Sequence, residues 1–121
     1  MINCLIVGLG GFIGTVFRYL IGLIPLNSKS EFPYKTLFIN IAGAFVIGMI
    51  VALALKNSSM DPKLVLFLKV GICGGFTTFS TFALESFDMF KSGSTVLALI
   101  YIVASVVLSI ACVFASNKIF A

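Results

Sequence analysis

The sequence predicts an all-α membrane protein with four transmembrane helices, the third of them broken at mid-membrane. Three observations predict this fold class. The 121 residues are 60% hydrophobic and 10% charged, whereas soluble domains average about 45–50% apolar and about 25% charged residues. The charges separate four apolar runs, each near the ~20 residues that cross a ~30 Å hydrocarbon core. In the third run, residues 71–82 hold three glycines and four hydroxyl residues, which weaken helical propensity.

The first span is expected at about residues 2–24, with Arg18 as its only charge. No basic flank precedes it and no small-residue cleavage site follows, so we do not expect a removed signal peptide. Arg18 has two interpretations. Its side chain reaches the lipid headgroups, or it lies in a water-filled vestibule and attracts anions. Gly10 and Gly14 have the spacing of residues that seat a neighbouring helix.

The second span is expected at about residues 36–55, after a polar loop whose turn formers are Asn27, Ser28, Ser30 and Pro33. It carries no charge, and Asn40 is its polar exception. An amide in hydrocarbon needs hydrogen-bond partners. Asn40 therefore either bonds a neighbouring helix or contacts an ion, and its position in the sequence does not separate these two roles.

The third span is expected at about residues 64–90, with its break at residues 74–77. Backbone freed from a helix at membrane depth is tolerated only where it is buried or lines a cavity. Channels and transporters use such breaks to aim carbonyls and helix ends at ions. Gly71 and Gly75 taken alone would more simply indicate close helix packing. Glu85, an acid in this span, is a functional candidate to which the sequence assigns no role.

The fourth span is expected at about residues 95–116. Tyr101, Ser105 and Ser109 recur every four residues, which places three hydroxyls on one helix face. A single serine would more simply bond back to its own helix. Three aligned hydroxyls favour a polar track along the span.

Composition also excludes several classes of function. The net charge is +4, but the lysines are scattered and form no basic stripe, so we expect no nucleic acid partner. The three cysteines share no close spacing, which supports neither a disulfide framework nor a metal site. With no histidine, four acids and no nucleophile motif, the chain is not expected to be an enzyme.

Three motifs resemble a known family. The run GGFTTFSTF at residues 74–82 resembles the signature of the small fluoride channels of the Fluc or CrcB family. The runs GGFIGTVFRY at 10–19 and KTLFINIAGAFVIG at 35–48 resemble its first and second motifs. This resemblance implies a fluoride-specific channel that lets fluoride leave the cytosol passively and so lowers its toxicity. It implies a multi-pass protein of the plasma membrane, whose partners are fluoride, lipid and a second copy of the chain.

The resemblance also implies site residues. Arg18 would lie in a vestibule, and the backbone carbonyls of Gly74 and Thr77 would hold a structural sodium ion (Na⁺) at the dimer interface. Carbonyl oxygens suit such a hard cation. Phenylalanine rings contact anions through their positive edges, and Phe76 is not one of the family's pair. The implied fluoride pathway comprises Phe79, Phe82, Asn40, Tyr101, Ser105, Ser109, Ser80 and Thr81.

Four spans are too few to enclose a pore, so we expect an antiparallel homodimer. With an even number of spans, the termini and the second loop share one side of the membrane. That side and the other each collect four Lys or Arg residues. Because the bias of these charges sets orientation, the balance predicts dual topology. A two-fold axis in the membrane plane would then bring both third-span breaks together around one cation.

Two other functions have the same four-span layout. A small proton-coupled multidrug exporter is the first alternative, but such exporters need a carboxylate in the first span, and residues 2–24 contain none. A structural or assembly subunit without transport activity is the second. Fluoride efflux separates the channel from both.

Overall fold

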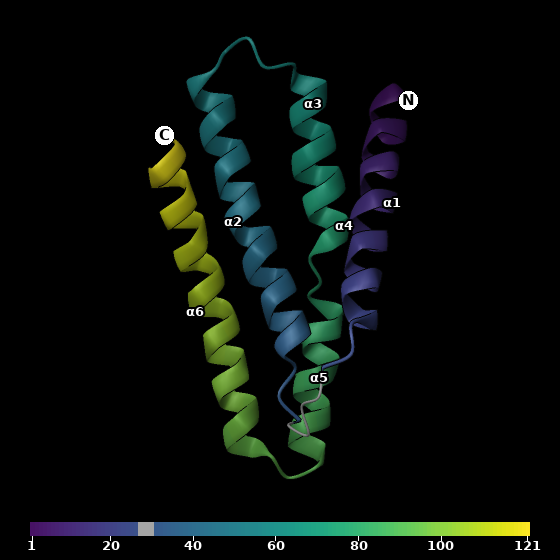
Figure 1. Ribbon diagram of the computed structural model, residues 1–121, viewed down its shortest axis with the longest axis vertical. Helices are drawn as coiled ribbons and strands as arrows, with labels where there is room; N and C mark the ends of the chain where they lie inside the picture. Colours follow the sequence, from purple (N-terminus) through teal and green to yellow (C-terminus); the bar gives the residue numbers. More distant parts are fainter. Residues whose placement is uncertain (27–30) are drawn as a thin grey trace.

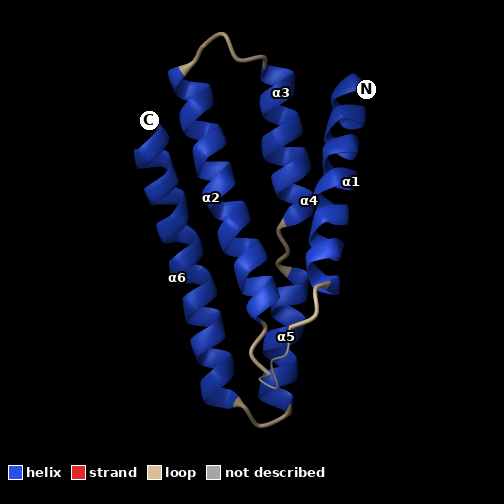
Figure 2. Cartoon of the chain, in the orientation of Figure 1, coloured by secondary structure: helices blue, strands red, loops and turns tan. Residues whose placement is uncertain are grey.

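Four long helical segments run side by side in the computed structural model, which describes residues 1–26 and 31–121 (Figure 1). No strand occurs in these two ranges (Figure 2). Asn27, Ser28, Lys29 and Ser30 lie outside them, and with them three of the predicted turn formers. The elements in chain order are α1 (Ile2–Leu23), α2 (Tyr34–Lys56), α3 (Pro62–Leu66), η1 (Phe67–Cys73), α4 (Gly74–Phe76), α5 (Ser80–Lys91) and α6 (Thr95–Phe120).

The four segments are long and apolar enough to cross a membrane. They are α1, α2, the third segment from Pro62 to Lys91, and α6. The prediction of an all-helical chain with four membrane-spanning segments is therefore confirmed. The last helix continues to Phe120, four residues beyond its predicted end at 116.

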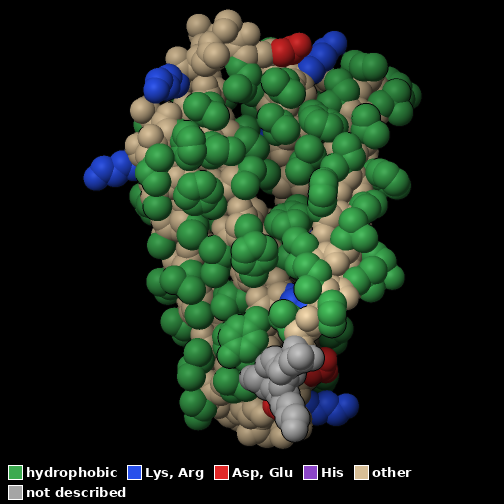
Figure 3. All heavy atoms as spheres, viewed as in Figure 1, with side chains coloured by type: hydrophobic (Ala, Val, Ile, Leu, Met, Phe, Trp, Pro, Cys, Tyr) green, Lys and Arg blue, Asp and Glu red, His purple; other side chains and the backbone are tan. Residues whose placement is uncertain are grey.

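Apolar side chains cover the outside of the bundle. On the face shown in Figure 3 they extend over its length, while most charged side chains gather near the two ends. Phe12 is 68% exposed and Phe114 74%. A soluble domain would bury such rings, whereas lipid solvates them. The buried core is correspondingly small and centres on Ala98 and Tyr101.

Glycines set the distance between α1 and the third segment. A Cβ added to Gly10 would lie 2.6 Å from the Phe67 carbonyl oxygen, and one added to Gly71 would lie 2.9 Å from the Gly10 Cα. A Cβ on Gly75 would lie 2.5 Å from the Gly11 carbonyl oxygen. The interpretation of Gly71 and Gly75 as packing residues is therefore correct, because only glycine lets the two backbones approach this closely.

The third segment changes its helix type before it is interrupted. Residues Phe67–Cys73 form a π-helix. This form is rare in proteins, and where it occurs it often lies at a functional site. Gly74 remains helical, with φ −63° and ψ −39°, whereas Thr77 is extended, with φ −79° and ψ 158°. The chain thus leaves the helix after Phe76, at the C-terminal end of the predicted break at residues 74–77. Gly71 and Gly75, before this point, pack against α1, whereas a Cβ added to Gly74 would meet nothing within 4 Å.

Candidate functional site

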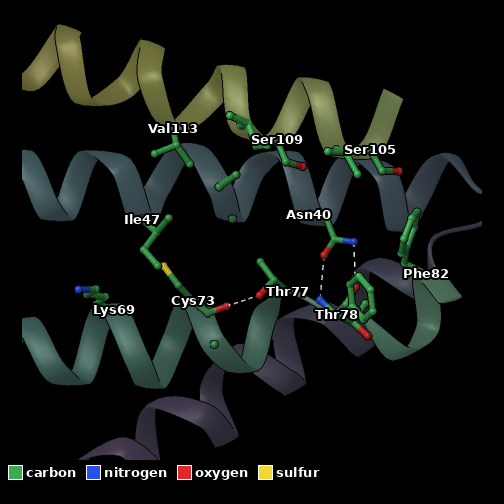
Figure 4. A pocket seen from close by; sticks show the side chains of 16 residues that line it. Asn40, Ile47, Lys69, Cys73, Thr77, Thr78, Phe82, Ser105, Ser109 and Val113 are labelled. Atoms are coloured by element: carbon green, nitrogen blue, oxygen red, sulfur yellow. Dashed lines mark hydrogen bonds between the residues drawn. The ribbon is translucent and has the colours of Figure 1, made fainter. Parts of the chain in front are cut away.

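A groove of ≈ 490 Å³ lies between α2, the third segment and α6. Figure 4 shows its lining, with residues of all three helical segments facing the same space. Five of the predicted pathway residues border it: Asn40, Phe79, Phe82, Ser105 and Ser109. The two predicted carbonyl donors, Gly74 and Thr77, border it as well.

Asn40 joins α2 to the interruption of the third segment. Its Oδ1 accepts from the Thr78 backbone N–H at 2.8 Å, and its Nδ2 donates to the Thr78 carbonyl at 2.9 Å (Figure 4). The side chain therefore supplies both bonds that Thr78 would make in a continuous helix. The interhelical role considered for Asn40 is real, and the same side chain faces the groove.

The two hydrogen bonds between Asn40 and Thr78 also affect the carbonyl of Gly74. In a continuous helix this oxygen would accept from the N–H of Thr78, four residues later. That N–H donates to Asn40 instead. A Cβ added to Gly74 would meet nothing within 4 Å, so this side of the backbone is open. The Gly74 carbonyl thus lacks its regular helical donor, in a residue that borders the groove.

The carbonyl of Thr77 is released in the same way. Its regular helical donor would be the N–H of Thr81, which instead donates to the Thr78 Oγ1 at 3.1 Å. Carbonyl oxygens are good ligands for a hard monovalent or divalent cation. No cluster of three or more His, Cys, Asp or Glu residues occurs in the described ranges. A cation at this place would therefore depend on backbone oxygens, and those of Gly74 and Thr77 fit that role.

The neighbouring carbonyl of Gly75 is used by α1. It accepts from the Thr15 Oγ1 and from the Arg18 Nε, each at 3.3 Å. Arg18 is half-buried and does not border the groove. Its Nε contact is with the backbone of the third segment, an arrangement that neither the headgroup nor the vestibule interpretation anticipated.

The two predicted phenylalanines have different surroundings. Phe79 is 79% exposed, whereas Phe82 is only 9% exposed. Their ring centroids are 5.6 Å apart, and the Phe82 ring lies 5.1 Å from that of Tyr101. Phe79 thus presents its ring freely at the groove, while Phe82 is held in place by the core behind it.

Tyr101 lies behind the groove and does not border it. Its hydroxyl donates to the Glu85 Oε1 at 2.9 Å, and the Thr36 Oγ1 donates to the Glu85 Oε2 at 3.0 Å. The position of Glu85 in the sequence assigned it no role. The structure places it as the acceptor that ties α2, α5 and α6 together. An acid in an apolar span, with a threonine in the preceding span and a tyrosine in the following one, was the available signal.

The hydroxyl track on α6 is therefore shorter than predicted. Ser105 and Ser109 border the groove, but Tyr101, one turn earlier, turns into the core. The Oγ of Ser105 is buried and has no hydrogen-bond partner in the described structure. Buried hydroxyls are rarely left without partners. Ser80, the first residue of α5, is exposed outside the groove, and Thr81, the second, does not border it either.

Lys69 is a charged groove residue that was not predicted. Lys69 borders the same space as Cys73 and Thr77 (Figure 4). These three residues are spaced by four, which puts them on one helix face. That spacing was visible in the sequence, but Lys69 entered only the Lys and Arg count of its side of the membrane.

Comparison with known proteins gives a consistent result. Residues 5–117 match the family described as CrcB-like protein, Camphor Resistance (CrcB). The fluoride-specific ion channel FluC of Agrobacterium fabrum (strain C58) is 46% identical over 116 residues, which cover 95% of this chain and 93% of the relative. The proteins of that name from Rhizobium meliloti (strain 1021) and Chlorobaculum tepidum are 43% and 42% identical. Their matches cover 95% and 97% of this chain and 93% of each relative.

Proposed function

Because this chain belongs to the CrcB family, we propose that it is a fluoride-specific ion channel that conducts fluoride along the groove. It is a multi-pass membrane protein, and passive efflux through it lowers fluoride in the cytosol. A channel of this kind is not an enzyme. The observation that carries the pathway is the Ser105 hydroxyl, which is buried in a residue of the groove wall and has no hydrogen-bond partner among the described residues. An anion in the groove would supply that partner.

The chemistry of the groove suits a small anion. Fluoride is strongly hydrated, so a narrow pathway must replace its water with hydrogen-bond donors. The hydroxyls of Ser105 and Ser109 are such donors. The amide of Asn40 has a second N–H beyond the one used for Thr78. Phe79 adds a ring whose positive edge contacts an anion without a charged group.

The groove is open along one side, so a second copy is needed to close it. We place that copy antiparallel, about a two-fold axis in the membrane plane. The balanced Lys and Arg count supports two orientations. The exposed Phe79 ring and the open side of Gly74 are surfaces that a partner would cover. The interruptions of both third segments would then lie together at mid-membrane.

A structural sodium ion between the copies follows from this arrangement. Gly74 and Thr77 would each contribute one carbonyl oxygen, and two copies would contribute four. The ion would supply positive charge that holds the two interruptions together. Protein prepared throughout with a bulky organic cation in place of sodium should lose fluoride flux. Full flux from such a preparation would refute the sodium site.

Ion efflux tests the function itself. The purified chain is reconstituted in liposomes loaded with fluoride or chloride, and efflux is recorded with ion-selective electrodes. The channel predicts rapid loss of fluoride without loss of chloride and without a proton gradient. Proton-coupled drug movement would identify an exporter, and silence would identify a subunit without transport activity. Either of these results would overturn the proposal.

A further inference from the structure

Lys69 is a cation within a membrane-spanning segment. It lies seven residues after Pro62, the first residue of α3, which corresponds to about 10 Å along a helix that rises 1.5 Å per residue. It borders the groove with Cys73 and Thr77. Figure 4 shows Lys69 and Phe82 toward opposite ends of the groove. A charged side chain at such a depth that faces a cavity is a functional candidate by default.

The electrostatic surroundings leave this charge uncompensated in the described structure. All four acids of the chain, Glu31, Asp61, Glu85 and Asp88, lie in the described ranges, and none of them borders the groove. Glu85 is already an acceptor for Thr36 and Tyr101. No ion pair of Lys69 occurs among the described residues. The other groove residues are uncharged, so Lys69 is the one charge among the described residues that line the groove.

From this position we propose that Lys69 attracts fluoride to one mouth of the groove and sets the rate at which the channel conducts. The inference rests on the proposed channel function. A single-sign charge beside a low-dielectric wall raises the local concentration of a counter-ion and its rate of arrival. Lys69 does not choose between fluoride and chloride, because a point charge attracts both. Its role is the supply of anions to the donors farther along the groove.

The charge can be tested at two ionic strengths. The Debye length is about 10 Å at 0.1 M salt and about 3 Å at 1 M. Fluoride flux at constant fluoride is measured in liposomes with an impermeant salt adjusting the ionic strength. We expect Lys69→Gln to lower flux several-fold at the lower ionic strength and much less at the higher one. Lys69→Arg should retain the flux of the unchanged chain.

Lys63→Gln is the matched control. Lys63 lies on the same side of the membrane by the topology count, so its loss changes the Lys and Arg balance as much as the loss of Lys69 does. It lies near the start of α3 and does not border the groove. Its flux should match that of the unchanged chain. Equal losses in both variants would refute a local role for Lys69.

A chemical test changes the sign of the charge within one folded protein. In a variant with Cys4, Cys73 and Cys112 replaced by alanine, Lys69→Cys is treated with a cationic or an anionic thiol reagent of similar size. The cationic reagent should raise fluoride flux and the anionic reagent should lower it further. Identical effects of both reagents, or none, would overturn the proposal. If the unchanged chain itself fails to conduct fluoride, the channel function fails and not only the role of Lys69.

Discussion

Phe79 and Phe82 border the same groove, but they differ in how much of the fold depends on them. Phe79 is 79% exposed, so Phe79→Ile should change the free energy of unfolding by less than about 0.5 kcal/mol. Phe82 packs on Tyr101, so Phe82→Ile should destabilise by about 1–3 kcal/mol. Both variants should lose fluoride flux, because isoleucine has no positive ring edge.

Efflux assays and denaturation in detergent measure these two effects separately. Phe87→Ile is the control, because Phe87 is 57% exposed on α5 and does not border the groove. It should leave both flux and stability unchanged. Normal fluoride flux through Phe79→Ile would show that the ring edge does not contact the ion.

Asn40 has two functions that substitutions can separate. Asn40→Ala removes both bonds to Thr78, whereas Asn40→Asp keeps an acceptor for the Thr78 N–H and loses the donor. Asn40→Ala should destabilise by about 1–2 kcal/mol, the upper range for hydrogen bonds between membrane helices, and Asn40→Asp by less. Both should abolish fluoride flux. Asn40→Ala removes the amide N–H that donates to the ion, and Asn40→Asp adds a negative charge to the groove.

Asn57→Ala is the matched control. Asn57 is exposed, and its Oδ1 accepts only from Ser59 in the same turn. Efflux and unfolding of this variant should match those of the unchanged chain. If Asn40→Ala conducts normally, Asn40 is solely a structural bond between α2 and the third segment.

At the scale of the helices, glycine contacts determine how α1 packs on the third segment. Gly10→Ala places a methyl group 2.6 Å from the Phe67 carbonyl oxygen and 2.8 Å from the Gly71 Cα. Backbone atoms cannot move aside as a side chain can, so overpacking should destabilise the protein by about 1–3 kcal/mol. Gly8→Ala, on the same helix, meets nothing within 4 Å and should be neutral.

Thermal unfolding in detergent compares the two variants directly. Fluoride flux is a second measurement, because Gly10 packs against Phe67 and Gly71 of the π-helix. Gly10→Ala should also reduce fluoride flux by shifting the groove wall formed by the third segment. Equal stability of the Gly8 and Gly10 variants would contradict the close approach.

The orientation of the whole molecule can be tested by labelling. Ser58 and Ser92 are exposed and lie in connections at opposite ends of the bundle (Figure 1). Single cysteines at these positions, in a variant without other cysteines, are treated with an impermeant thiol reagent in intact cells. Because the Lys and Arg count is balanced, each cysteine should be labelled in only part of the molecules.

A fixed topology would give a different pattern. One cysteine would then be labelled fully and the other only after the membrane is permeabilised. That result would exclude the antiparallel dimer. It would also exclude the cation bound by the Gly74 and Thr77 carbonyls of both copies. Efflux of fluoride by a single chain or a parallel dimer would still have to be tested separately.

The sequence by itself determined the number of spans, their approximate bounds and the residue types of the groove. Hydropathy is a sum over neighbouring residues, so four apolar runs predict four helices without any knowledge of their contacts. The spacing of Ser105 and Ser109 predicted a shared face for the same reason, since helical period is a local property. The family motifs added the phenylalanine pair and Asn40.

Only the tertiary structure decided which of these residues meet. Gly75 and Arg18 are 57 residues apart in the sequence, far more than neighbours within one helix. Their contact depends on how closely α1 approaches the third segment. The chain stays helical through Phe76 and is interrupted from Thr77, where Asn40 and the Thr78 hydroxyl take the N–H donors that a continuous helix would use. Packing across helices also turned Tyr101 into the core and left Lys69 in the groove. Such outcomes depend on distances between segments, which local periodicity does not contain.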